Sequence, residues 1–225
     1  MCERIPPPCS EAELLGRAEG LAGLSLGHLA TRLGEQAPAD PRRAKGYAGR
    51  LLELALGADA TSRPEPDCTR LGIELKTVPV DPAGMPREST YLTLAPLRGM
   101  TGLRWQESAV RRKLLRMLWI PIESGREIPL SSRRIGWPVL WSPSPEQEAV
   151  LRQDWEELML MLTTGQLGSL DSRHGRWLQI RPKAANGRAL TAAHDETGAP
   201  AADLPRGFYL RTRFTAQILR AGMAA

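Results

Sequence analysis

The chain has 225 residues, of which 42% are apolar and six are Trp, so it can bury a core without a disulfide framework. Its 30 Lys and Arg outnumber its 25 Asp and Glu, and clustered positive charge favours a polyanionic partner such as nucleic acid. Three cysteines without a C-x-x-C pair, no zinc-ligand spacing and no long apolar run predict a soluble, cytoplasmic protein that does not insert into a membrane.

Three amphipathic helices are predicted in the first 60 residues. Ser10 and Glu13 form a capping-box pattern, and Ser25 can cap the second helix. The helices are expected from Ser10 to about Leu21, after Ser25, and over Lys45–Ala58, where Gly57 ends the apolar spacing. The third helix carries a carboxylate, Glu53, within an otherwise apolar turn.

The next segments predict two strands and a helix. Strand patterns cover residues 71–80 and 90–97, and the sequence DPAGMP between them indicates a β-hairpin. Residues 107–119, ESAVRRKLLRMLW, place apolar side chains on one side and basic side chains on the other. We therefore expect one helix there, ended by Pro121.

The second half of the chain mixes strands and helices. The strongest helix pattern is Pro145–Leu162, with acidic residues early and Gly165 after its end. RRIGWPVLW is consistent with a short strand pair, RWLQIRPKA with a strand entering a basic loop, GFYLRTRF with a last strand and TAQILRAG with a terminal helix. Residues 186–205 are expected to form a surface loop.

The sequence contains one candidate catalytic group, formed by Asp67, Glu74 and Lys76. Side chains alternate along a strand, so Glu74 and Lys76 point to the same face, with Asp67 just upstream. Two carboxylates and a lysine suit phosphodiester hydrolysis, because a bound Mg²⁺ can activate water and hold the phosphate. The same trio also fits an ordinary solvated strand face. Glu53 is a candidate third carboxylate, or a residue on the exposed edge of its helix.

Two basic groups also have two interpretations. Lys113 belongs to a run of basic residues on a predicted helix, and such runs are usually solvated or contact phosphates. Arg181 and Lys183 follow a strand and precede a Gly-containing loop, where they could contact guanine or phosphates. Surface charge alone also explains the RPK sequence.

Seven sequence blocks occur in order along nearly the whole chain: KGYAGRLLE, PEPDCTRLGIELKTVPVD, VRRKLLRMLWIP, VLWSP, DWEELM, LQIRPKAAN and LPRGFYL. Together these blocks resemble the MutH family of DNA mismatch repair endonucleases. The resemblance implies an α/β fold with a type II restriction-endonuclease-like core, a mixed β-sheet flanked by helices, and two arms that form a DNA-binding cleft. Residues 1–225 would form a single endonuclease domain with two sub-lobes around that cleft.

The resemblance also implies roles for particular residues. The divalent metal would be held by Asp67, Glu74, Glu53 and the backbone carbonyl of Leu75, and catalysis would use these carboxylates with Lys76 and Lys113. DNA would be contacted by Lys45, Tyr91, Arg181, Pro182, Lys183 and Tyr209. Tyr91 stands where the family has Phe, and Tyr209 matches a tyrosine implicated in sensing adenine methylation.

The activity implied is a nick 5′ of the guanine in the unmethylated strand of hemimethylated GATC, made with one or two Mg²⁺ ions and activated by MutL. The protein is expected to act on double-stranded DNA as a monomer. One alternative is a GATC-specific restriction endonuclease that cuts both strands. Another is a DNA-binding module without catalytic activity, whose carboxylates are structural.

Overall fold

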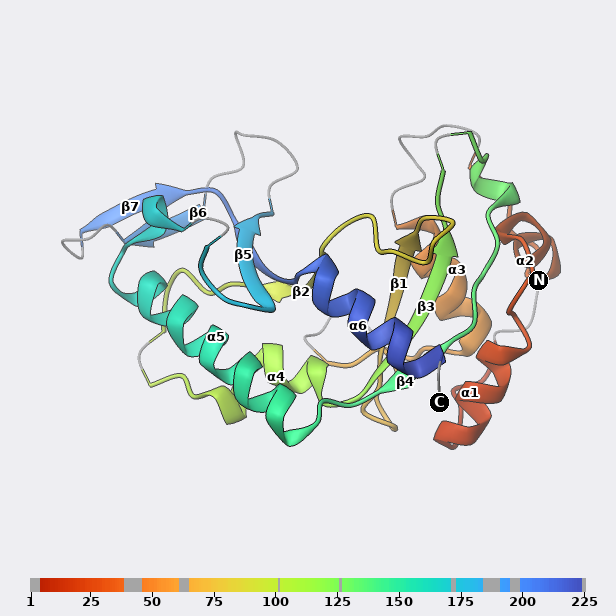
Figure 1. Ribbon diagram of the computed structural model, residues 1–225, viewed down its shortest axis with the longest axis horizontal. Coiled ribbons are helices and arrows are strands. Elements are labelled where there is room, and N and C mark those ends of the chain that lie inside the picture. Colours follow the sequence, from red (N-terminus) through yellow and green to blue (C-terminus); the bar gives the residue numbers. More distant parts are fainter. Residues whose placement is uncertain are drawn as a thin grey trace. The chain divides into compact units, whose positions relative to one another are not determined.

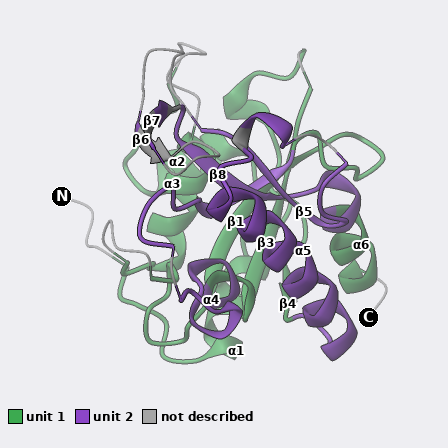
Figure 2. Cartoon of the chain, turned by 90° about the vertical axis from the view of Figure 1, so that its left-hand side faces the viewer, with its two compact units in different colours: residues 1–88, 113–142, 216–225 green, residues 89–112, 143–215 purple. Residues whose placement is uncertain are grey.

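The computed structural model describes residues 5–38, 46–60, 65–100, 102–125, 127–170, 173–183, 191–194 and 199–223. The chain divides into two compact units (Figure 2). Unit 1 comprises residues 1–88, 113–142 and 216–225, and unit 2 comprises residues 89–112 and 143–215. Each unit is therefore assembled from segments that are far apart in the sequence.

Unit 1 contains a three-stranded mixed sheet and three N-terminal helices (Figure 1). The strands are β1 (Glu74–Val80), β3 (Met117–Glu123) and β4 (Val139–Trp141), in the order β1-β3-β4. β1 runs parallel to β3, and β4 runs antiparallel to it. The helices are α1 (Glu11–Glu19), α2 (Leu26–Arg32) and α3 (Tyr47–Leu56), and η3 (Leu130–Ser132) is a short 3₁₀ turn against α2.

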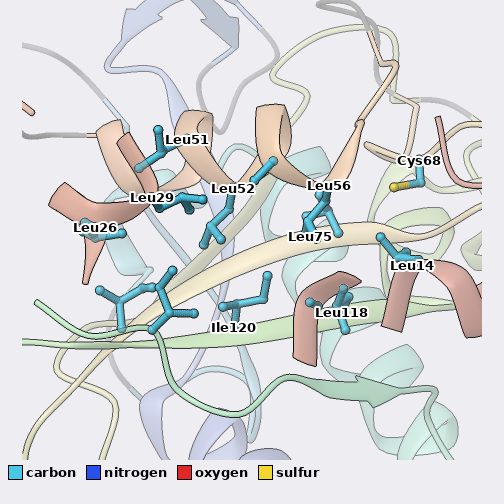
Figure 3. Close-up of a cluster of buried hydrophobic side chains, with 14 of the residues drawn as sticks. Leu14, Leu26, Leu29, Leu51, Leu52, Leu56, Cys68, Leu75, Leu118 and Ile120 are labelled. Carbon is cyan, nitrogen blue, oxygen red and sulfur yellow. The ribbon is translucent and has the colours of Figure 1, made fainter. Parts of the chain in front are cut away.

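The core of unit 1 lies between these helices and the sheet. One side of α3 buries Leu51, Leu52 and Leu56, as the apolar spacing of its sequence requires. Figure 3 shows Leu52 and Leu56 between α3 and β1, with Leu75 and Leu118 in the same cluster. Because α3 packs directly on β1, this core fixes the strand that carries Glu74 and Lys76.

Unit 2 contains an antiparallel sheet in the order β2-β8-β5. Its strands are β2 (Thr90–Leu94), β5 (Leu178–Pro182) and β8 (Arg206–Leu210), and a separate hairpin pairs β6 (Thr191–His194) with β7 (Pro200–Asp203). The long helix α5 (Pro145–Thr163) packs on β5. The described residues of the unit also include two 3₁₀ turns, η2 (Trp105–Glu107) and η4 (Leu167–Ser169).

Two helices cross the boundary between the units. Lys113 and Leu114, at the end of α4 (Ala109–Leu114), belong to unit 1, whereas the start of the helix belongs to unit 2. α6 (Thr212–Met223) passes from unit 2 into unit 1 after Thr215. Among the described residues, no helix is long and apolar enough to cross a membrane.

The predicted hairpin between residues 71–80 and 90–97 is wrong. Both segments are strands, but β1 pairs with β3 in a continuous parallel register, and β2 pairs with β8. The two strands thus belong to different sheets and different units. The turn predicted between them is confirmed: Asp81 accepts hydrogen bonds from the backbone N–H groups of Ala83 and Met85, and Gly84 has φ +76°.

The predicted helix over residues 107–119 is also wrong in its second half. The helix α4 ends at Leu114, and the residues from Met117 onward form the central strand β3, buried at every position except Glu123. A fully buried strand lacks the alternation that identifies a strand in sequence, so its apolar run continued the apparent helical pattern. Pro121 lies inside this strand, which tolerates it because β4 pairs only with Met117–Trp119.

Smaller differences occur near the C-terminus. The expected surface loop at residues 186–205 contains the hairpin β6/β7, whose alanine-rich strands give a weak strand signal. The last strand ends at Leu210 and the terminal helix begins at Thr212, earlier than expected. Of the expected pair in RRIGWPVLW, Val139–Trp141 forms β4, and Ile135 makes only an isolated bridge to Ile122.

Replacing Leu52 with Ala should lower the free energy of unfolding by about 2–5 kcal/mol, because the leucine is fully buried between α3 and β1 and its loss leaves a cavity. Leu54→Ala is the matched control in the same helix, since that side chain is 37% exposed and its replacement should change stability by less than about 0.5 kcal/mol. Urea denaturation of both variants measures the difference; equal losses would contradict the described core.

Candidate active site

The centre of the candidate site is Glu74, the first residue of β1, which has no exposed surface. Its Oε1 atom accepts hydrogen bonds from two lysines, at 2.5 Å from Nζ of Lys76 and 2.7 Å from Nζ of Lys113. Lys76 is two residues along the same strand, so strand alternation brings the two side chains together. Lys113 comes from the end of α4 and is far away in sequence.

Asp67 reaches this centre through a tight turn. Cys68 and Ile73 pair across the turn, and Gly72 adopts φ +65°, a conformation that a residue with a Cβ rarely adopts. The turn brings Oδ2 of Asp67 to 2.9 Å from the backbone N–H of Leu75, which donates to it. Asp67 is therefore fixed beside the start of β1.

Burial raises the pKa of Asp67, and the nearby negative charge of Glu74 raises it further. The positive charge of Lys76, the hydrogen bond from Leu75 and the charge of Lys113 oppose this shift. The carboxylate is thus held in an environment that disfavours its own negative charge. A cation close to Asp67 would relieve this unfavourable electrostatic energy.

Glu53 stands at the exposed edge of α3, as one of its two sequence interpretations allowed. Its neighbours still withdraw it partly from water, and this desolvation raises its pKa, with a further increase from the charge of Asp67 and a smaller one from Glu74. Lys76 lowers it. Glu53 is therefore close enough to share one electrostatic environment with Asp67 and Glu74.

The basic run on α4 divides into different roles. The Lys113 side chain is only 13% exposed and points to Glu74, so it is not an ordinary solvated lysine. Arg111, two residues earlier, instead pairs with Glu148 of α5 within unit 2, Nε to Oε1 at 2.6 Å. Arg112 is exposed. The run as a whole therefore does not behave as a single charged surface.

The residues of this site fit a hard divalent cation. Oε2 of Glu74 is buried and accepts no hydrogen bond from the described residues, which leaves a carboxylate oxygen available to a metal. Carboxylate and carbonyl oxygens are the ligands that Mg²⁺ prefers, and three carboxylates outnumber the two lysines here. Within the described part of the chain, no group of three or more His, Cys, Asp or Glu side chains is arranged so that it could hold a metal ion by itself. Mg²⁺ ordinarily keeps several water ligands when it binds to a protein.

The residues expected to contact DNA gather on the sheet of unit 2. Tyr91 of β2 and Tyr209 of β8 are opposite each other, with ring centroids 5.3 Å apart in an edge-to-face arrangement. Nζ of Lys183 lies 3.9 Å from the centroid of the Tyr91 ring. The guanidinium carbon of Arg181 lies 5.9 Å from the centroid of the Tyr209 ring. Pro182, between them, is exposed at the end of β5. Lys45 lies outside the described residues.

Sequence reasoning missed two residues that organise unit 2 around β5. Gln179 shares the face of Arg181, because it is two residues earlier in β5, and its amide donates to Ser89 Oγ at 2.8 Å. Asp154 of α5 is buried and accepts from three consecutive backbone N–H groups, those of residues 176, 177 and 178. The alternation of LQIRP could have indicated Gln179, whereas nothing in the sequence connects Asp154 to β5.

Comparison with known proteins identifies the family. The family model described as "DNA mismatch repair enzyme MutH" matches residues 56–154. A DNA mismatch repair protein MutH from Vibrio cholerae is 54% identical over 215 residues, 96% of this chain and 97% of the relative. The chain belongs to the MutH family. The MutH proteins of Yersinia enterocolitica and Salmonella paratyphi B are each 52% identical, covering 95% and 97% of this chain and 93% and 95% of the relatives.

As a MutH family member, the chain is an endonuclease of DNA mismatch repair, which confirms the family expected from the seven sequence blocks. Its mixed α/β architecture, with small sheets flanked by helices, is consistent with the restriction-endonuclease-like fold of that family. The segment matched by the MutH model includes Asp67, Glu74, Lys76 and Lys113. Family membership therefore applies to the part of the chain that forms the candidate site.

The two lysines on Glu74 should stabilise the fold non-additively. In Lys76→Ala or Lys113→Ala, Glu74 keeps the other lysine, and we expect each single variant to lose about 1 kcal/mol of unfolding free energy. The double variant leaves a fully buried carboxylate without a cation and should lose at least about 3–5 kcal/mol, more than the two single losses together. Urea denaturation of the four proteins measures this; additive losses would contradict the shared pairing.

Proposed function

We propose that this protein nicks the unmethylated strand of hemimethylated GATC sites, 5′ of the guanine, in a Mg²⁺-dependent reaction activated by MutL. The observation that carries the proposal is Glu74, a fully buried carboxylate that holds Lys76 and Lys113 beside Asp67 in a chain of the MutH family. Burying such a group of charges lowers the free energy of unfolding in an ordinary strand. A catalytic role in phosphodiester hydrolysis explains why the group is present.

The residues of unit 1 have complementary tasks in this proposal. Asp67, Glu74, Glu53 and the Leu75 carbonyl would hold Mg²⁺, which when bound supplies a Lewis acid and lowers the pKa of a bound water. Lys76 and Lys113 supply positive charge at fixed positions, where negative charge develops on the phosphate in the transition state. Glu74 orients both ammonium groups through one oxygen, and thus positions them before DNA binds.

The residues of unit 2 provide sequence selection. Arg181 and Lys183 can donate to the O6 and N7 atoms of guanine, while Tyr209 stands on the same sheet face as a candidate sensor of adenine methylation. We further propose that both units act on one duplex, in the two-armed cleft of a single domain, and that the protein acts as a monomer. Tyr91, Pro182 and Lys45 are proposed as further DNA contacts.

A restriction endonuclease that cuts both strands of GATC is the remaining alternative, because it would use the same metal chemistry. The non-catalytic DNA-binding module is disfavoured by membership of an endonuclease family. The two enzymes differ in their response to methylation and in their need for MutL, and both properties can be measured with one set of substrates.

The decisive assay uses unmethylated, hemimethylated and fully methylated GATC duplexes with Mg²⁺, with and without MutL. The proposal expects a single nick in the unmethylated strand, strong stimulation by MutL and no cutting of fully methylated DNA. Glu74→Ala and Lys76→Ala should bind these duplexes but lose at least about 100-fold in nicking rate.

The variants also test the enzyme assignment of these residues. If Glu74→Ala and Lys76→Ala nick at the parental rate, the active site lies elsewhere. Double-strand cleavage of unmodified sites without MutL, with no preference for one strand, would instead establish the restriction alternative.

Arg181→Ala should weaken discrimination between GATC and an altered site by about 1–3 kcal/mol, since a bidentate guanine contact would be lost. Arg213→Ala, an exposed arginine of α6, is the control for loss of positive charge and should leave the discrimination unchanged. Binding of both variants to matched and altered duplexes separates the two effects. A uniform loss on both duplexes in Arg181→Ala would assign this residue to phosphate contact.

A further inference from the structure

The sheet of unit 2 has two different faces. One face is buried and carries Leu178, Ile180, Phe208 and Leu210. The other carries Tyr91, Tyr209, Gln179 and Arg181, which register and alternation place side by side. Gly207 of β8 also lies on this second face but has no side chain; it is directly opposite Arg181 in β5 and two residues before Tyr209.

Gly207 is buried beneath the two tyrosines. A Cβ atom added there would lie 2.8 Å from Cε2 of Tyr91 and 3.2 Å from both Cε2 of Tyr209 and the carbonyl oxygen of Thr93. Separations this short force a displacement, and the Tyr91 ring makes the shortest one. The backbone of Gly207 does not have the positive φ that would itself require glycine. Its missing side chain therefore provides the space in which the two rings meet.

Each tyrosine ring lies close to one basic side chain. Lys183 Nζ lies over the Tyr91 ring and the Arg181 guanidinium near that of Tyr209, in the range of cation–π attraction. Displacing the Tyr91 ring would move the surface on which Lys183 rests. A methyl group at position 207 would also stand next to the side chain of Arg181 across the strand pair.

We propose that Gly207 is a specificity-determining positioning residue, whose missing side chain lets Tyr91 and Tyr209 pack together and so sets where Arg181 and Lys183 meet DNA. The proposal rests on the function proposed above, in which these basic residues select GATC. Gly207 contacts no DNA in this account and acts only through its neighbours. It has no part in the hydrolytic chemistry, which the residues of unit 1 perform.

The test is the ratio of dissociation constants for a duplex without GATC and a hemimethylated GATC duplex, measured with Ca²⁺ in place of Mg²⁺. Gly207→Ala should reduce this ratio by about fivefold or more, with an unchanged dissociation constant for the duplex without GATC. Gly168→Ala is the matched control in unit 2, because a Cβ there meets no atom within 4 Å, and should keep the parental ratio.

The outcomes separate the two proposals. A parental ratio of about one would refute GATC selection itself. A parent that discriminates, together with a Gly207→Ala variant that discriminates equally well, would overturn only the role of Gly207. A variant that loses affinity equally on both duplexes would also overturn it, since a general structural defect has that effect.

If Gly207→Ala does not fold, the double variant Gly207→Ala/Tyr91→Leu carries the test, because the ring that the methyl group meets is then absent. The proposal expects it to fold and to show the same weak discrimination as Tyr91→Leu alone. A folded double variant with the parental ratio would overturn the proposal. Failure of the double variant to fold would overturn it too, because the obstacle would then be the backbone rather than the ring.

Discussion

The candidate active site depends on one buried ionic contact, the carboxylate of Glu74 bonded through a single oxygen to Lys76 and Lys113. Burying these three charges is unfavourable unless they compensate one another, so the contact determines how β1 and the end of α4 are placed within unit 1. The leucines of α3 hold β1 from the other side. The second oxygen of Glu74 has no hydrogen-bond donor among the described residues, and this feature connects the packing of the strand to metal binding.

Local patterns were sufficient to predict most helices but not the pairing of strands. Caps and apolar spacing located α1, α2, α3 and α5, since these signals lie within a few residues of the elements they specify. The parallel pairing of β1 with β3 has no local signal, because residues distant in sequence form it. The prediction of a helix through β3 is wrong for a related reason: a strand buried on both faces has no alternation of apolar and polar residues, so its apolar run extends the helical pattern of α4.

The site was predictable to a different extent. Strand alternation alone indicated that Glu74 and Lys76 would share a face, and their hydrogen bond has that geometry. Nothing local could show that Lys113 reaches the same carboxylate, because its neighbours Arg111 and Arg112 have the same charge and different surroundings. The family resemblance singled it out. The roles of Gly207 and Asp154 could not be predicted from the sequence. The space left by a glycine, and the bonding of a carboxylate to backbone groups distant in sequence, are defined only by the tertiary structure.

The most direct test of this account is a crystal structure with Mn²⁺, whose anomalous scattering locates the ion independently of the protein coordinates. We predict a Mn²⁺ ion bonded to Oε2 of Glu74 and to Asp67, with Lys76 and Lys113 still beside the site. An ion bound elsewhere, or Glu74 without any metal contact at saturating Mn²⁺, would contradict the claim that this buried carboxylate joins the lysines to the metal.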